Sequence, residues 1–102
     1  MRQSAEFSTV LARRQVQRGK HVVMYYASNG LTVARLGLIV GRKVDRRAVA
    51  RNLFKRIVRE AFRAVRMELP PLDIVVRALA QLGNVERAEL RLELHSLFSK
   101  LA

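Results

Sequence analysis

The stretch RRAVARNLFKRIVREAFRAVR, residues 46–66, sorts into two faces when it is wound as a helix. At roughly 100° per residue, its apolar side chains occupy one half of the helical wheel. They are Leu53, Phe54, Ile57, Val58, Ala61, Phe62 and Val65. Its polar side chains fall within an arc of about 100° on the other half. They are Asn52, Lys55, Arg56, Arg59, Arg63 and Arg66. The spacing predicts a long helix with one buried face and one cationic face.

This cationic face is unusual for a surface helix, because like charges one turn apart repel each other. We therefore expect a polyanionic partner that relieves the repulsion. Arginine side chains present fixed forks that match phosphate oxygens. The amide of Asn52 adds a group that can accept a hydrogen bond from a ribose 2′-hydroxyl. Two alternatives stay open, namely a solvated basic face without a dedicated partner and a helix that lies on a membrane surface.

The charge of the whole chain favours nucleic acid as that partner. The formal net charge is +12 and the isoelectric point is near 11.7, which is typical of a nucleic-acid-binding domain. Residues 1–66 hold 16 lysines and arginines against three acids, whereas residues 67–102 hold four against five. We expect the binding surface in the first two thirds of the chain and a mainly structural role for the last third.

Composition excludes several other classes of protein. Half of the 102 residues are hydrophobic, so the chain can bury a core as one domain, residues 1–102. It has no cysteine, which excludes disulfides and thiolate metal sites. No apolar run is long enough to cross a bilayer, and the N-terminus lacks a signal core, so we expect a cytoplasmic protein. We find no catalytic constellation and no metal-ligand spacing.

The N-terminal part predicts a helix, a link and two strands. Ser4 can cap a first helix, and residues 13–20 are polar and basic, as in an irregular or short extended link. Residues 21–26, HVVMYY, are β-branched and aromatic and predict a strand. The Asn29-Gly30 dipeptide is a strong turn signal. It predicts a hairpin that the strand at residues 36–40, LGLIV, closes.

The rest of the chain adds the long helix, a third strand and a last helix. Asp45 is a plausible cap for the long helix, and Pro70 with Pro71 must end it. Residues 72–76, LDIVV, are apolar enough for a central strand. The last helix places one apolar stripe on a single face. It consists of Leu90, Leu94, Leu97, Phe98 and Leu101. The order α-β-β-α-β-α predicts an α+β fold with helices packed on a small sheet.

A second candidate site combines Phe7 and Leu11 of the first helix with Val23 and Tyr25 of the first strand. Each pair shares one face of its element. If the helix lies across the strand, an aromatic surface forms beside several cations, and such surfaces hold single-stranded nucleic acid. Simple core packing is the alternative, and for apolar residues it is the more common arrangement.

Several runs of residues resemble the bacterial ribonuclease P protein family. The first is RLGLIVGRKV at residues 35–44, which is followed by RRAVARN at residues 46–52 and KRIVREAFR at residues 55–63. The similarity extends to LP at residues 69–70 and LDIVV at residues 72–76, and it covers nearly the whole chain. The spacing of the Arg-Asn, Lys-Arg and Arg-Glu pairs is specific to this family.

The resemblance implies a ribonucleoprotein endonuclease that removes the 5′ leader from precursor tRNA. In that family the RNA subunit performs the hydrolysis with Mg²⁺, and the protein binds this RNA and the leader without being a catalyst by itself. The resemblance also implies an unusual left-handed β-α-β crossover around the long helix. No catalytic residue, protein-bound metal or other cofactor is expected in the chain.

The resemblance, together with the cationic face, also assigns residues to each RNA. The expected contacts with the RNA subunit are Arg46, Arg47, Arg51, Asn52, Lys55, Arg56, Arg59 and Arg63. The expected contacts with the leader are Phe7, Leu11, Val23 and Tyr25. The sequence departs from the family at Leu53, where the motif usually has a third basic residue, and at Leu11, where an aromatic residue is common.

Two other functions remain to be distinguished at this point. One is a non-catalytic module, such as a ribosomal protein, that uses the same basic helix on another structured RNA. The other is a stand-alone nuclease, which the lack of a catalytic constellation disfavours.

Overall fold

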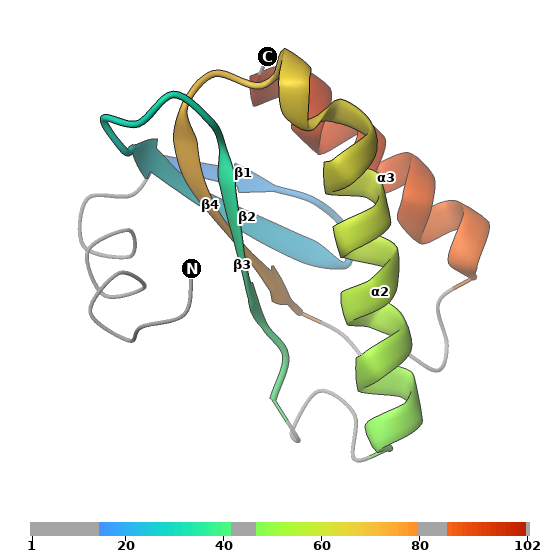
Figure 1. Ribbon diagram of the computed structural model, residues 1–102. Coiled ribbons are helices and arrows are strands. Elements are labelled where there is room, and N and C mark those ends of the chain that lie inside the picture. The colour runs from blue at the N-terminus through green and yellow to red at the C-terminus, as the bar shows by residue number, and fades with distance from the viewer. Residues whose placement is uncertain (1–14, 42–46, 80–85, 102) are drawn as a thin grey trace.

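The computed structural model of the protein describes residues 15–41, 47–79 and 86–101, which form one sheet with two long helices on it (Figure 1). Its elements in chain order are β1 (Gln15–Arg18), β2 (Val22–Ser28), β3 (Arg35–Ile39), α2 (Ala48–Val65), the short 3₁₀ helix η1 (Arg66–Glu68), β4 (Leu72–Ala78) and α3 (Arg87–Leu101). The predicted first helix, Ser4, Asp45 and the turn before α3 lie outside the described residues. The remaining elements confirm the predicted α+β class. Their order agrees with the prediction except that β1 is an additional strand, within residues 13–20 where an irregular or short extended link was expected.

The core lies between one face of the sheet and the two helices. Alternate residues of the central strands point into it, among them Val22, Met24, Ile74 and Val76, all fully buried. The apolar face of α2 and the leucine stripe of α3 meet them, and the predicted stripe of α3 is buried in full. The rings of Phe62 and Phe98 pack at 6.0 Å between their centroids and join the two helices.

The strand order β1-β2-β4-β3 corrects one prediction. The two strands around Asn29-Gly30 do not form a hairpin, because β4 lies between them and pairs antiparallel with β2 and parallel with β3. Gly30 does adopt a turn conformation with φ of +69°. The central position of β4 agrees with its burial, since four successive residues of this strand, Asp73 to Val76, are buried. The amide N–H of Asn29 donates to the carbonyl of Pro71, which starts β4 beside the end of β2.

The connection from β3 through α2 to β4 joins two parallel neighbouring strands. In Figure 1 both strands run downward, β3 lies in front of β4, and α2 runs back up on the right. Seen from the start of the strands along their direction, the chain turns counterclockwise as it passes from β3 through α2 to β4. The crossover is therefore left-handed. The family resemblance implied this crossover, whereas the general rule for parallel strands favours the right-handed one. The crossover places α2 beside the edge strand β3.

The ends of the long helix differ in detail from the prediction. Arg47 occupies the N-cap position, with extended backbone and no side-chain capping bond. The helix ends at Val65, and η1 continues for three residues before Leu69 turns to extended backbone with ψ of 141°. That conformation is the one that a following proline imposes, here Pro70. Within the described residues, no helix is long and apolar enough to cross a membrane.

Candidate RNA-binding surface

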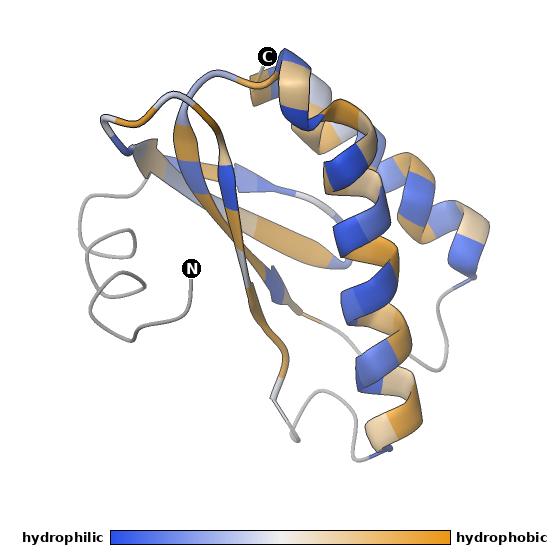
Figure 2. Cartoon of the chain, viewed as in Figure 1, coloured by the Kyte–Doolittle hydropathy of each residue, from blue (hydrophilic) through white to orange (hydrophobic). Residues whose placement is uncertain are grey.

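The polar side of α2 faces solvent along the whole helix. Asn52, Arg56, Arg59 and Arg63 are exposed and Lys55 is half-buried, whereas Phe54, Ile57, Val58 and Phe62 on the opposite side are buried. Figure 2 shows the hydrophilic residues as a stripe on the side of α2 that is turned toward the viewer. The two faces predicted from the helical wheel are therefore present. Of the other residues expected to contact the RNA subunit, Arg47 is exposed, Arg51 is half-buried, and Arg46 lies outside the described residues.

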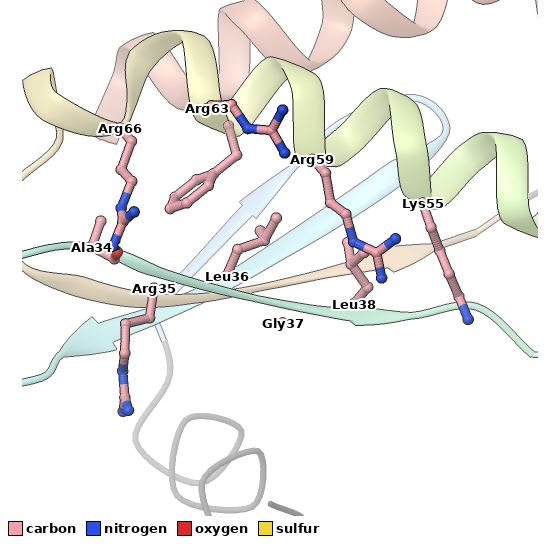
Figure 3. A pocket seen from close by; sticks show the side chains of 10 residues that line it. Ala34, Arg35, Leu36, Gly37, Leu38, Lys55, Arg59, Arg63 and Arg66 are labelled. Atoms are coloured by element: carbon pink, nitrogen blue, oxygen red, sulfur yellow. The ribbon is translucent and has the colours of Figure 1, made fainter. Parts of the chain in front are cut away.

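A groove of about 510 Å³ runs between α2 and β3 (Figure 3). Lys55, Arg59 and Arg63 line it from α2, and Arg66 lines it from η1. Its opposite wall and floor are formed by β3 and by one aromatic ring of α2. These residues are Ala34, Arg35, Leu36, Gly37, Leu38 and Phe62. The groove is the one feature of this surface that the helical wheel could not predict, because it depends on where the crossover places β3.

The cations of this surface have few partners within the protein. Arg66 donates from Nε to the carbonyl of Ala34 at 3.3 Å, which holds η1 against the start of β3. The Nε atom of Arg56 lies 3.9 Å from the Glu60 carboxylate, a long and exposed pair that contributes little. Within the ranges 15–41, 47–79 and 86–101, no acid forms an ion pair with Lys55, Arg59 or Arg63. Their charges are therefore available to an external anion.

Arg35, which also borders the groove, is used differently. Its guanidinium forms a bidentate pair with Asp73, at 2.7 Å from Nε to Oδ1 and 2.6 Å from Nη2 to Oδ2. The side chain of Asn29 also donates to Asp73, at 3.1 Å, and to the carbonyl of Val33, at 3.0 Å. The bond from Arg35 is the main cause that lowers the pKa of Asp73 below 3.8. This carboxylate therefore joins β4, β3 and the loop between β2 and β3.

A second acid, Glu93 of α3, anchors the turn between β1 and β2. Its Oε2 atom accepts from the backbone N–H groups of His21, at 2.9 Å, and Val22, at 3.0 Å, while Oε1 lies 2.8 Å from Nδ1 of His21. Its side chain is only 12 % exposed. A Cβ atom on Gly19 would lie 2.5 Å from the Glu93 carboxylate, so a side chain at this position would have to displace that carboxylate. The sequence pattern around Glu93 does not indicate this role, because acids mixed with Arg87 and Arg91 on one helix are typical of a solvated face.

The second face of the sheet, away from α2 and α3, carries the described part of the predicted leader site. Val23 and Tyr25 share this face, but Val23 is fully buried and Tyr25 is half-buried. In this structure, Val23 offers no surface to a ligand. Phe7 and Leu11 lie outside the described residues, so the structure does not test whether the four side chains meet.

Two arginines that sequence reasoning missed lie on the same face. Arg18 of β1 and Arg77 of β4 stand directly opposite Val23 in the register of the sheet, so their side chains leave the same side of it. Both are exposed. The strand pairing was needed to find them, because Arg77 is distant in the sequence from Arg18 and Val23.

No group of three or more histidine, cysteine or acidic side chains in the described ranges could hold a metal ion. The fold and the surface thus define a basic α+β domain with a cationic helix face and an adjoining groove. Residues 1–102 match the protein family described as Ribonuclease P. The chain therefore belongs to the ribonuclease P protein family.

Individual relatives agree with this assignment. The chain is 46 % identical over 96 residues to the ribonuclease P protein component of Azoarcus sp. strain BH72, covering 94 % of this chain and 80 % of the relative. It is 45 % identical over 97 residues to the component from Chromobacterium violaceum, covering 95 % and 80 %. Among solved structures, the RNase P protein from Thermotoga maritima in complex with 1-(4-fluorophenyl)-2-thiourea superposes with a TM-score of 0.89 at 30 % identity, covering 100 % of this chain and 99 % of that one.

Proposed function

We propose that this chain is the protein subunit of a ribonuclease P, and that it binds the catalytic RNA subunit through the exposed face of α2. The observation that carries the proposal is the row of Lys55, Arg59 and Arg63, which line one groove and form no ion pair with an acid of the described residues. Burial of the opposite face in the core holds this row in place. Cations spaced along a rigid helix can neutralise successive phosphates of a folded RNA without a rearrangement of the protein backbone.

The proposed contact with the RNA subunit also includes residues next to Lys55, Arg59 and Arg63. Asn52, Arg56 and the basic residues at the start of the helix, Arg46, Arg47 and Arg51, would contact the same RNA. Arginine forks suit phosphate oxygens, and the amide of Asn52 can serve a ribose hydroxyl. These contacts position the protein on the RNA and carry little sequence information themselves.

The second face of the sheet is the proposed site for the 5′ leader of precursor tRNA. Tyr25 supplies an aromatic surface there, and Arg18 and Arg77 supply positive charge beside it. Stacking combined with neutralisation of the backbone is the usual way to hold a single strand. Phe7, Leu11 and Val23 complete the proposed leader site. Access to Val23 requires that the side chains around it separate when the leader binds.

The proposal leaves the chemical step to the RNA subunit. Endonucleolytic cleavage at the mature 5′ end of tRNA would use Mg²⁺ held by that RNA, and the protein would bind both RNAs and strengthen metal-dependent catalysis. The chain would bind no cofactor of its own. A location in the cytoplasm belongs to the same proposal.

Reconstitution is the experiment that tests this function. Purified bacterial ribonuclease P RNA is mixed with precursor tRNA at low Mg²⁺ concentration, with and without the protein. We expect the protein to raise the rate of leader removal. No gain in rate would favour a non-catalytic module for another structured RNA. Cleavage by the protein without the RNA subunit would instead identify a stand-alone nuclease.

The leader site has its own test, which compares the binding of precursor and mature tRNA to the reconstituted complex. Replacement of Tyr25 by Ala should weaken binding of precursor tRNA about 10-fold, since stacking of one base contributes roughly 1–3 kcal/mol. Binding of mature tRNA should change little, because it lacks the leader. Tyr25→Phe is the matched control, since it keeps the ring. Equal losses for precursor and mature tRNA would contradict the assignment of the leader to this face.

A further inference from the structure

We propose that the groove between α2 and β3 receives an unstacked nucleotide of the RNA, with its base on the apolar floor and its neighbouring phosphates on the cationic rim. The inference rests on the proposed function, because it names which part of an RNA this surface takes. The proposed function requires only that the cations contact phosphates.

The floor of the groove is the first observation. Leu36 and Leu38 point from β3 toward α2 and stay partly exposed (Figure 3). Phe62 of α2 also lines the groove. At about 510 Å³, the groove has the size of sites that hold small organic ligands, roughly 300–1,000 Å³. It is thus large enough for a base, and the leucine and phenylalanine side chains of its floor have no group that binds phosphate.

The second observation is the rim of the groove, whose basic side chains lie mainly on the α2 side. Lys55, Arg59 and Arg63 follow one another at intervals of one turn, about 6 Å along the helix axis, and Arg66 continues the row in η1. Among the described residues that line the groove, Arg35 is the one basic group on the strand side, and its guanidinium is bound to Asp73. A strand of RNA would therefore run along the α2 side, with its sugar-phosphate backbone on the helix and its base directed toward β3.

A regular duplex does not fit this arrangement. Its bases are stacked inside, and it presents phosphates and riboses to a protein. Bound to the rim, a duplex would leave Leu36 and Leu38 recessed beneath the cations and in contact with water. An unstacked base can enter and bury that apolar surface. Sequence-specific proteins generally bind RNA at loops, bulges and ends for this reason.

The first test follows the methyl groups of Leu36 and Leu38 by NMR in the full chain. Three probes carry matched backbones: a ten-nucleotide single-stranded RNA, the same strand with abasic riboses, and the same strand in a duplex. We expect only the single strand with bases to shift the methyl signals of Leu36 and Leu38. Both residues face α2, on the side of the sheet opposite Tyr25, so binding at the proposed leader site would not mimic this result. Equal methyl shifts with the abasic strand or the duplex would overturn the proposal.

The second test fills the groove without a change in charge. Leu38→Phe should weaken binding of ribonuclease P RNA about 10-fold and leave the salt dependence of binding unchanged. Leu92→Phe is the matched control, because Leu92 is exposed on α3 and does not line the groove. Wild-type affinity in a folded Leu38→Phe variant would overturn the inference while leaving the proposed function intact. If the wild-type chain fails to bind this RNA at all, the proposed function itself is wrong.

Discussion

The protein uses the charged side chains of α2 and the carboxylates of Asp73 and Glu93 in opposite ways. On α2, Lys55, Arg59 and Arg63 stand in a row on the surface and form no ion pair with a described acid. Asp73 and Glu93 are largely buried, and each bonds to several donors from other elements. The comparison separates charges that hold the fold together from charges that are left for a partner. It predicts that the first group affects stability and the second group affects RNA binding.

The largest effect should come from removal of the row on α2. The triple replacement of Lys55, Arg59 and Arg63 by Ala should weaken binding of ribonuclease P RNA roughly 100- to 1,000-fold at about 0.1 M salt, because each phosphate contact contributes close to one factor of ten there. The thermal unfolding temperature should stay the same or rise slightly, since repulsion along the helix is relieved. A binding titration and a melting curve measure the two quantities.

The matched control removes the same charge from α3. Arg87, Arg91 and Lys100 are all exposed, and their triple replacement by Ala should reduce affinity far less. If both triple variants lose affinity equally, binding reflects net charge alone and the comparison between regions fails.

The next effect is on stability and comes from Glu93. Glu93→Ala leaves two buried backbone N–H groups, those of His21 and Val22, without their acceptor. We expect a loss of about 2–3 kcal/mol in the free energy of unfolding, measured by urea denaturation. Glu68→Ala removes an exposed acid of η1 that forms no ion pair within the described residues, and it should change stability by less than about 0.5 kcal/mol. Similar losses of stability for the two variants would contradict a stabilising role of the Glu93 carboxylate.

A smaller effect, and one that depends on pH, is expected at Asp73. The hydrogen bond from Arg35 lowers the pKa of Asp73 below 3.8, so its contribution is complete above that pH and is lost as the pH falls through the lowered value. Asp73→Asn should cost about 1–2 kcal/mol at neutral pH. The difference from wild type should shrink in acid. Denaturation curves between pH 7 and pH 2 check this, and a difference that is constant with pH would contradict the role of the ion pair.

The parts of the structure that the sequence predicted well are those in which a local pattern decides the outcome. The two faces of α2 and the leucine stripe of α3 follow from helical periodicity alone, and both are present. The predicted hairpin failed because Asn29-Gly30 specifies a turn but does not specify which strand will pair beyond it. That choice depended on β4, which arrives 40 residues later and takes the central position.

The same distinction applies to the candidate site. The cations of α2 could be named from the sequence, since neighbours at one-turn spacing share a face. The groove, the pairing of Arg35 with Asp73 and the position of Arg18 and Arg77 beside Val23 could not, because each joins elements that the crossover or the strand register brings together. The acids gave no local signal for their roles. An acid on a mixed-charge helix, such as Glu93, has the same sequence pattern whether it faces water or a backbone amide.

The salt dependence of binding between this protein and ribonuclease P RNA tests the central claim most directly. If about six cations of the α2 surface meet phosphates, the logarithm of the binding constant should fall against the logarithm of the salt concentration with a slope of roughly −4 to −5. The triple α2 variant should reduce the steepness by about 2–3. A wild-type slope near zero, or an unchanged slope in the variant, would contradict the account.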